Sequence, residues 1–249
     1  MICLRPDWPA PANVYALCTT REGGVSQVPY AALNLADHVG DDEAAIAENR
    51  TRLGAVLPPA ASVCWLRQVH GTQVVEAGPA DAPPEADASV SRTAGQVCAV
   101  LTADCLPVLF ASTSGNEVGA AHAGWRGLLD GVLEATIAAL HSAPESLLAW
   151  LGPAIGPTAF EVGPEVRAAF MERAGAAHAP TAACFRDAPD RAGHSYADLY
   201  SLARIRLAAA GITRIYGGEC CTFREAERFY SYRRDGETGR MASLIGFTV

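Results

Sequence analysis

The sequence contains no lysine, and all 19 of its basic residues are arginine. This absence excludes every mechanism that needs a lysine amine: Schiff-base catalysis, pyridoxal phosphate chemistry and the lysine of a Walker-type phosphate loop. Arginine is therefore the only permanently charged side chain with which this protein can bind an anion.

Long apolar runs and basic tracts are also missing. No stretch of about 18 uncharged apolar residues occurs, so we expect no membrane-spanning helix. The segment Met1–Pro11 lacks the apolar core of a secretory signal peptide. A net charge of -8 without a basic tract argues against a nucleic-acid partner. The eight cysteines are too few for a disulfide scaffold, so we expect a cytoplasmic protein with free thiols. No heptad pattern demands a partner helix, and we expect a monomer.

What the sequence does contain is a mixture of strand and helix patterns that predicts an α/β (α+β) fold. We expect one domain over residues 1–249, because no linker separates the motifs. Apolar runs predict strands at Val14–Thr20, Ser62–Val69, Val97–Thr102, Pro107–Ala111, Glu117–His122 and Ile212–Tyr216. Caps and spacing predict helices from Asp41 or Asp42 to Gly54 and over Leu128–Leu140, Pro164–Arg173 and Leu199–Ala210. Residues 77–88 and 175–194 are rich in Ala, Pro, Gly and Asp, and we expect loops there.

Three side chains with metal-ligating or nucleophilic chemistry follow strand-like runs. His70 and His122 each precede a glycine-containing turn, and Cys105 lies in a break between two apolar runs. Strand ends of this kind face the ligand crevice in α/β proteins. Two imidazoles and a thiolate can bind zinc and leave a fourth position open. Alternatively, Cys105 is a nucleophile with a histidine as its base, or all three are ordinary polar and buried side chains.

Two glycine-containing turns also carry an arginine. Arg126 lies in the turn Gly124–Gly127 before an expected helix, and Arg21 lies in the segment Thr20–Ser26. Small residues and free backbone N–H groups suit such turns to anion binding. A tight turn that needs glycine for its backbone angles explains Gly124–Gly127 slightly better. His38 is a further candidate for lining a site.

Several short strings occur in one order along the chain. They are Thr20–Ser26, Asn34-Leu35, Arg67–Gly71, Ala86–Ala88, Thr102–Val108, Ala121–Gly127, Gly152–Gly156 and Phe229–Arg233. In this order the strings resemble the YfiH-like family, also called the laccase-domain or polyphenol oxidase family. The resemblance covers nearly the whole chain and is unbroken at His70, Cys105 and His122.

The resemblance implies mixed β-sheets sandwiched by helices, in a YfiH-like architecture. It also implies that His70, Cys105 and His122 bind one Zn²⁺ ion and act in catalysis. Within or beside the matching strings, we expect five residues to bind the nucleoside or phosphate: Arg21, Asn34, Arg67, Gln68 and Arg126.

Members of this family are described as purine nucleoside phosphorylases of adenosine, inosine, guanosine and methylthioadenosine that also deaminate adenosine. Other descriptions are a peptidoglycan editing amidase, which removes L-serine from a UDP-muramyl precursor, and a copper-dependent phenol oxidase. Six histidines are too few for a blue-copper centre plus a trinuclear cluster, although Cu²⁺ can bind a His-Cys-His set. We therefore expect a zinc-dependent nucleoside phosphorylase whose partners are a nucleoside and phosphate. Asp104 and Glu161 are candidates for its general acid.

Overall fold

The protein is described here by a computed structural model that covers residues 3–249. The strands are β1 (Cys3–Leu4), β2 (Val14–Thr19), β3 (Ser62–Cys64), β4 (Val74–Glu76), β5 (Ala88–Ser91), β6 (Gln96–Thr102), β7 (Leu106–Ser112), β8 (Val118–Ala123), β9 (Leu147–Leu151), β10 (Glu161–Val162), β11 (Phe185–Asp187), β12 (Ser195–Ala197), β13 (Arg214–Gly217) and β14 (Met241–Phe247). The α-helices are α1 (Glu43–Gly54), α2 (Trp125–Asp130), α3 (Val132–Ala139), α4 (Pro164–Arg173), α5 (His178–Ala183), α6 (Leu199–Ala209) and α7 (Tyr232–Asp235).

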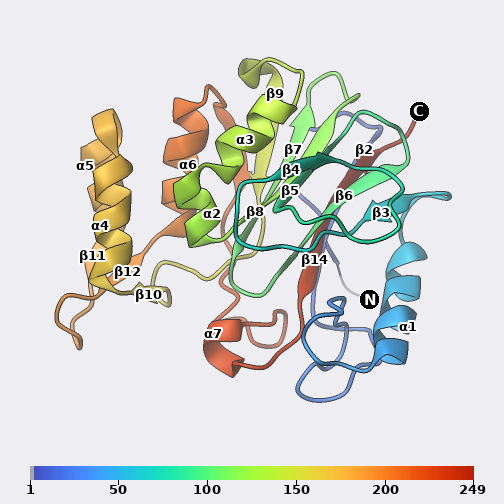
Figure 1. The fold of residues 1–249 in the computed structure, drawn as a ribbon, viewed down its shortest axis with the longest axis horizontal. Coiled ribbons are helices and arrows are strands. Elements are labelled where there is room, and N and C mark those ends of the chain that lie inside the picture. The colour runs from blue at the N-terminus through green and yellow to red at the C-terminus, as the bar shows by residue number, and fades with distance from the viewer. Residues whose placement is uncertain (1–2) are drawn as a thin grey trace.

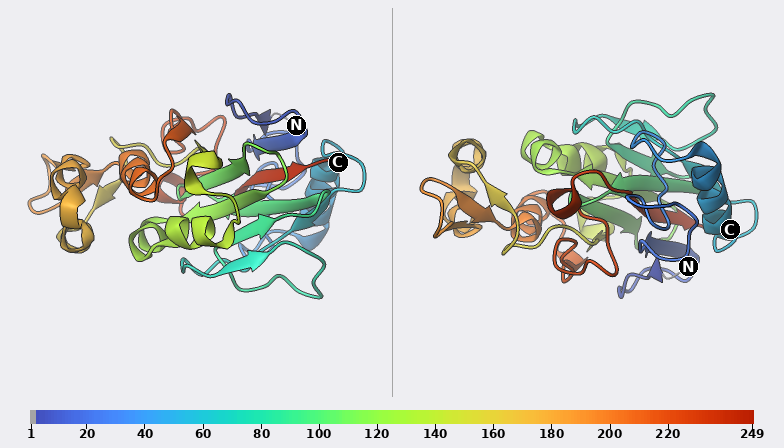
Figure 2. Two further views of the ribbon diagram at one scale, coloured as in Figure 1. Left: turned by 90° about the horizontal axis from the view of Figure 1, so that it is seen from above. Right: turned by 90° about the horizontal axis from the view of Figure 1, so that it is seen from below.

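Two mixed sheets lie face to face and are covered by helices on their outer faces (Figures 1 and 2). One sheet has the order β1-β2-β14-β6-β3, and the other has the order β13-β9-β7-β8-β5-β4. Helix α1 covers the outer face of the first sheet, whereas α3 and α6 pack on the second. The predicted architecture of mixed sheets sandwiched by helices is confirmed.

Alternation along the strands explains why their sequences are almost wholly apolar. In β6, Val97 and Ala99 face α1, whereas Cys98 and Val100 face the other sheet. In β7, Val108 packs toward the helices of the second sheet, and Leu109 packs between the sheets. Because both faces of these strands are covered, both sets of positions must be apolar.

Aspartate caps define the starts of two predicted helices. The Asp42 carboxylate accepts a hydrogen bond from the Ala45 N–H at 2.8 Å and begins α1. The Asp198 carboxylate accepts from Ser201 N–H at 3.0 Å and begins α6. Each cap satisfies an N–H group that has no partner within its helix.

Several predicted boundaries were wrong. The helix expected over Leu128–Leu140 is two helices, because Gly131 has a φ of 106° and ends α2. The expected strand Ser62–Val69 ends at Cys64, and the chain then leaves the sheet. Residues 175–194, expected as a loop, contain α5 and β11.

The segment that contains α5 and β11 belongs to an appended unit at one end of the molecule. Strands β10, β12 and β11 form a third, small sheet, which lies beside α4 and α5 (Figure 1). Phe170 of α4 packs against Phe185 of β11, with ring centroids 5.8 Å apart. Within residues 3–249, no helix is long and apolar enough to cross a membrane.

Leu109 tests the packing between the two sheets, since its side chain is completely buried there. We expect Leu109→Ala to lower the free energy of unfolding by about 2–5 kcal/mol, because the substitution removes buried methyl groups and leaves a cavity. Urea unfolding followed by circular dichroism measures this change. Val56→Ala is the control: its side chain is 43% exposed, so a similar loss there would contradict the assignment of the core.

Candidate metal centre

Three loops and strand ends meet at one end of the two sheets. His70 lies in the connection between β3 and β4, and His122 lies near the end of β8. Cys105 lies in the turn between β6 and β7, where the chain passes from the first sheet to the second. The structure thus brings together residues that the sequence separates widely.

The ligating atoms of these three side chains are close enough to share one metal ion. All of them lie within 4.8 Å of one another, and Cys105 Sγ lies 3.9 Å from His70 Nε2. The two imidazole rings meet edge to face, with centroids 4.8 Å apart. Within residues 3–249, this is the one group of three or more His, Cys, Asp or Glu side chains with such spacing.

Asp87 holds two of the three residues in place. Its carboxylate is completely buried and accepts hydrogen bonds from the backbone N–H groups of Val69, His70 and Gly71 at 2.7–3.1 Å. The same carboxylate lies 2.8 Å from His122 Nδ1. This contact assigns the ring proton to Nδ1, so that Nε2 is the atom with a free electron pair. Carboxylate–histidine pairs of this kind orient metal-binding imidazoles.

Backbone strain concentrates beside the cluster. The backbone φ angle is 61° at His70 and 97° at Asp104. Residues other than glycine rarely adopt such positive φ angles. The three N–H bonds to Asp87 stabilise the strained turn at His70. Asp104 is anchored in turn by Thr222 Oγ1 at 2.6 Å and by the Arg233 N–H at 2.7 Å. Both ligand-bearing turns are therefore fixed by a buried carboxylate.

Gly124 leaves the space that the cluster needs. A Cβ atom added at Gly124 would lie 2.9 Å from Cys105 Sγ, 3.1 Å from His70 Cδ2 and 3.6 Å from His122 Nε2. The turn Gly124–Gly127 thus passes against the three candidate ligating side chains. From the sequence, this turn was either an anion site or a tight turn. Its glycine permits that close approach.

The ionisable groups of the cluster stabilise one another's charges. Burial opposes ionisation of Cys105, but the adjacent histidines outweigh burial and lower the pKa of its thiol. Burial also opposes the charge of Asp87, yet the bonds from His122 and the backbone lower the pKa of its carboxyl group. Cys105 and Asp87 in turn raise the pKa of the His122 imidazole to about 9. Two imidazoles and a thiolate within 4.8 Å of one another fit a divalent metal ion, which would take the place of the protons on these groups.

The cluster lines one wall of an open cleft of about 390 Å³. Gln68 lines the cleft too, and its side-chain amide pairs with both backbone polar groups of Leu101. Tyr232 and Arg240 also line the cleft, as does His38, the further lining candidate named from the sequence. Such a volume is typical of a small-molecule site.

The other predicted binding residues do not line this cleft. Arg21 donates hydrogen bonds to the carbonyls of Ala31 and Ala226. Arg67 forms an exposed ion pair with Glu85, and exposed Arg126 stacks on Trp125. Asn34 is buried behind the cleft, where its side-chain oxygen accepts the backbone N–H of Arg240 at 3.0 Å. Among the candidates for the general acid, Asp104 is bonded as described above, and Glu161 pairs with His194 in the appended unit.

The sequence led to no predicted role for Asp87 or Arg240. Asp87 stands between two alanines directly before β5, and an acid flanked by small apolar residues is a signal of a buried, paired carboxylate. Arg240 carries no such signal, because only the pairing of β14 with β6 brings it beside the cluster. Tyr232 lies in the string Phe229–Arg233 and begins α7, which Ser231 caps.

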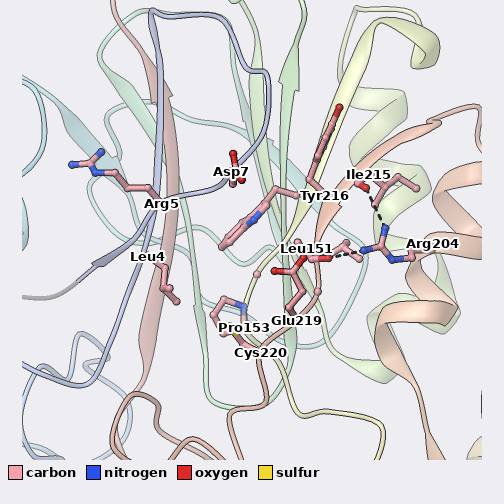
Figure 3. A pocket seen from close by; sticks show the side chains of 14 residues that line it. Leu4, Arg5, Asp7, Leu151, Pro153, Arg204, Ile215, Tyr216, Glu219 and Cys220 are labelled. Atoms are coloured by element: carbon pink, nitrogen blue, oxygen red, sulfur yellow. Dashed lines mark hydrogen bonds between the residues drawn. The ribbon is translucent and has the colours of Figure 1, made fainter.

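A second cleft of about 360 Å³ lies where the parallel strands β9 and β13 end (Figure 3). Arg204 reaches its edge, but its guanidinium donates to the carbonyls of Ile215 and Gly217 at 3.2 and 2.6 Å. None of the predicted site residues lines this cleft. The predicted metal-ligating and nucleophilic residues therefore lie at the cleft of the His-Cys-His cluster and not at this second cleft.

Comparison with known proteins shows the family of this chain. The family model described as "Multi-copper polyphenol oxidoreductase laccase" matches residues 15–248. The chain belongs to this laccase-domain family. Its relatives include "Purine nucleoside phosphorylase PA4543" of Pseudomonas aeruginosa, 56% identical over 97% of both chains, and "Purine nucleoside phosphorylase YfiH" of Escherichia coli, 54% identical over 96% of both. The solved structure of Neisseria meningitidis NMB0706 superimposes with a TM-score of 0.92 at 49% identity and covers 99% of both chains.

For this laccase-domain protein, we expect Asp87→Asn to weaken metal binding by about 10- to 100-fold, because an amide cannot accept all of the bonds that orient His70 and His122. Competition for Zn²⁺ with a chromophoric chelator measures the affinity. Glu85→Gln is the matched control, since Glu85 is exposed and pairs only with Arg67. Equal affinities of the Asp87→Asn and wild-type proteins would show that the carboxylate does not orient the cluster.

Gly124→Ala tests the cluster without removing any donor atom. We expect the added methyl group to displace Cys105 Sγ and His70, and so to lower Zn²⁺ affinity in the same chelator assay. Gly54→Ala is the control, because a Cβ at Gly54 meets no atom within 4 Å. Unchanged affinity of Gly124→Ala would place the metal elsewhere.

Proposed function

We propose that this protein is a zinc-dependent purine nucleoside phosphorylase. The observation that carries the proposal is the His70, Cys105 and His122 cluster, fixed by Asp87 at the wall of an open cleft. Two relatives that align over nearly the full chain carry the name purine nucleoside phosphorylase. The proposed partners are a purine nucleoside and inorganic phosphate.

Zinc is the metal that this donor set favours. His70, Cys105 and His122 would hold it through two imidazole nitrogens and one thiolate, which is a zinc ligand set with an open position. Bound there, zinc would supply a Lewis acid for a phosphate or ribose oxygen, or acidify a water molecule. A multicopper centre needs further histidines, and within residues 3–249 no second cluster of three such ligands occurs.

The residues of this chain supply positioning and electrostatics. Phosphorolysis requires an anionic phosphate to attack the ribose carbon while the purine leaves. Positioning of the reactants and electrostatic stabilisation of their charges therefore contribute most to lowering the activation barrier. Asp87 keeps the His122 ring in one orientation through Nδ1. Tyr232 is 61% exposed and lines the cleft. Its aromatic ring offers a face on which a purine can stack.

Adenosine, inosine, guanosine and methylthioadenosine form the proposed substrate range, because they share a purine on a ribose. Hydrolytic deamination of adenosine is the second proposed reaction of the same centre. The observation that favours it is the three-ligand set itself, which leaves a position for a water molecule.

Cys105→Ala provides the test of this function. We expect the variant to lose bound zinc, because the thiolate ligand is gone. The rate of phosphate-dependent hypoxanthine release from inosine should fall at least about 100-fold. Zinc content is measured by atomic absorption, and the products by chromatography with and without phosphate. Cys3→Ala, which alters a thiol on β1, is the control.

Two outcomes would contradict the proposal. Full inosine phosphorolysis by metal-free protein would exclude the metal from the reaction. Absence of turnover in the fully zinc-loaded wild-type protein would exclude purine nucleosides as substrates.

A further inference from the structure

Arg240 occupies an unusual position for a charged side chain. It lies immediately before β14, and Met241 pairs with Thr102 at the end of β6. The connection from β6 to β7 then carries Cys105. Arg240 therefore lines the same cleft as the His-Cys-His cluster, on the side of Tyr232.

The guanidinium of Arg240 has unused donors. Its Nη1 donates to the carbonyls of Thr238 and Gly239 at 2.6 and 3.0 Å. Its Nε and Nη2 groups have no hydrogen-bond partner within residues 3–249, and no carboxylate of that range lies within ion-pair distance. Its one other contact is the Tyr232 ring, whose centroid is 5.8 Å from the Arg240 Cζ atom.

Arg240 is a partly buried cation that has no ion-pair partner within residues 3–249, and its burial costs hydration. Burial lowers the pKa of Arg240, and the nearby charges of Cys105 and Asp104 oppose this effect, although neither group forms a hydrogen bond or ion pair with the guanidinium. The Asp104 carboxylate instead accepts hydrogen bonds from Thr222 and from the Arg233 N–H. The unused donors of Arg240 can therefore bind an anion in the cleft.

The backbone holds Arg240 rigidly in this position. The buried Asn34 accepts its N–H, and the Asn34 amide is fixed in turn by Ala36 and Asp41. A Cβ at Gly239 would lie 2.7 Å from the Tyr230 ring and 3.0 Å from Asn34 Cβ, so the chain threads tightly between them. An arginine held this firmly loses little additional freedom when it binds a ligand.

We propose that Arg240 binds a phosphate-type oxyanion in the cleft through its Nε and Nη2 groups, with Asn34 as the positioning residue. The planar guanidinium fork matches two oxygens of such an anion. This inference rests on the proposed phosphorolysis for the identity of the anion, which is then inorganic phosphate. In this proposal, Arg240 takes the anion-binding role for which Arg21 and Arg126 were the candidates, because neither of those two residues lines the cleft.

Arg240→Gln tests the site in the zinc-loaded, full-length protein. Calorimetric titration with inorganic phosphate should show binding to the wild type and binding about 10- to 100-fold weaker in the variant, as loss of charge-assisted bonds implies. In steady-state assays, the KM for phosphate should rise by a similar factor, while the KM for inosine and the zinc content stay close to wild type.

Arg167→Gln is the matched control, since Arg167 forms an exposed ion pair with Asp187 in the appended unit. Thermal unfolding without phosphate checks the fold of every variant. If Arg240→Gln does not fold, Arg240→Lys replaces it: the charge remains but the fork is lost, and weaker phosphate binding is again expected.

A parallel titration with inosine 5′-monophosphate distinguishes free phosphate from phosphate carried on the substrate. If this nucleotide binds through Arg240 and inorganic phosphate does not, the oxyanion site stands and the proposed phosphorolysis fails. If a folded Arg240 variant binds phosphate and turns over inosine like the wild type, the site is wrong while the proposed function stands. If neither anion binds the wild type, the site is also wrong.

Discussion

One buried carboxylate organises the functional end of this molecule. Asp87 accepts three backbone N–H groups from the turn at His70 and contacts His122 Nδ1. Without these bonds, nothing in the local sequence would hold His70 in the left-handed region or select one ring orientation of His122. The distances among the ligating atoms follow from this arrangement. A charge that is completely buried is tolerated because all of its bonds are satisfied.

Asp104 is a second buried carboxylate that holds a turn beside the cluster through hydrogen bonds. Its carboxylate joins the turn that carries Cys105 to Thr222 and to the start of α7, which brings Tyr232 to the cleft. Segments that are distant in the sequence thus reach one cleft through two buried acids. The cleft combines the candidate metal-binding cluster with the cationic Arg240, and this arrangement suits the proposed reaction between an anion and a polarised substrate.

Local patterns predicted those parts of the structure that depend on neighbours in sequence. Apolar runs such as Val97–Thr102 predicted buried strands, and Asp42 and Asp198 predicted helix starts, because caps and alternation act within a few residues. The helix over Leu128–Leu140 was predicted unbroken because its apolar spacing continues through Gly131, whose backbone angle only the fold determines. At His70, Cys105 and His122, the residues alone left metal binding, nucleophilic catalysis and ordinary structural roles open, and only the family resemblance implied a zinc site. Asp87 and Arg240 act through pairings between distant strands, and no local pattern reports those pairings.

The turn from β6 to β7 has a consequence for the whole fold. His70 follows a strand of the first sheet, His122 belongs to the second, and Cys105 lies on the chain that joins them. An ion bound to all three would close a ring through both sheets and act as a reversible cross-link. Metal binding and folding would then be linked, since only the native state presents all three donors. The resistance of the sheets to separation would then depend on the free concentration of the metal as well as on the apolar core between them.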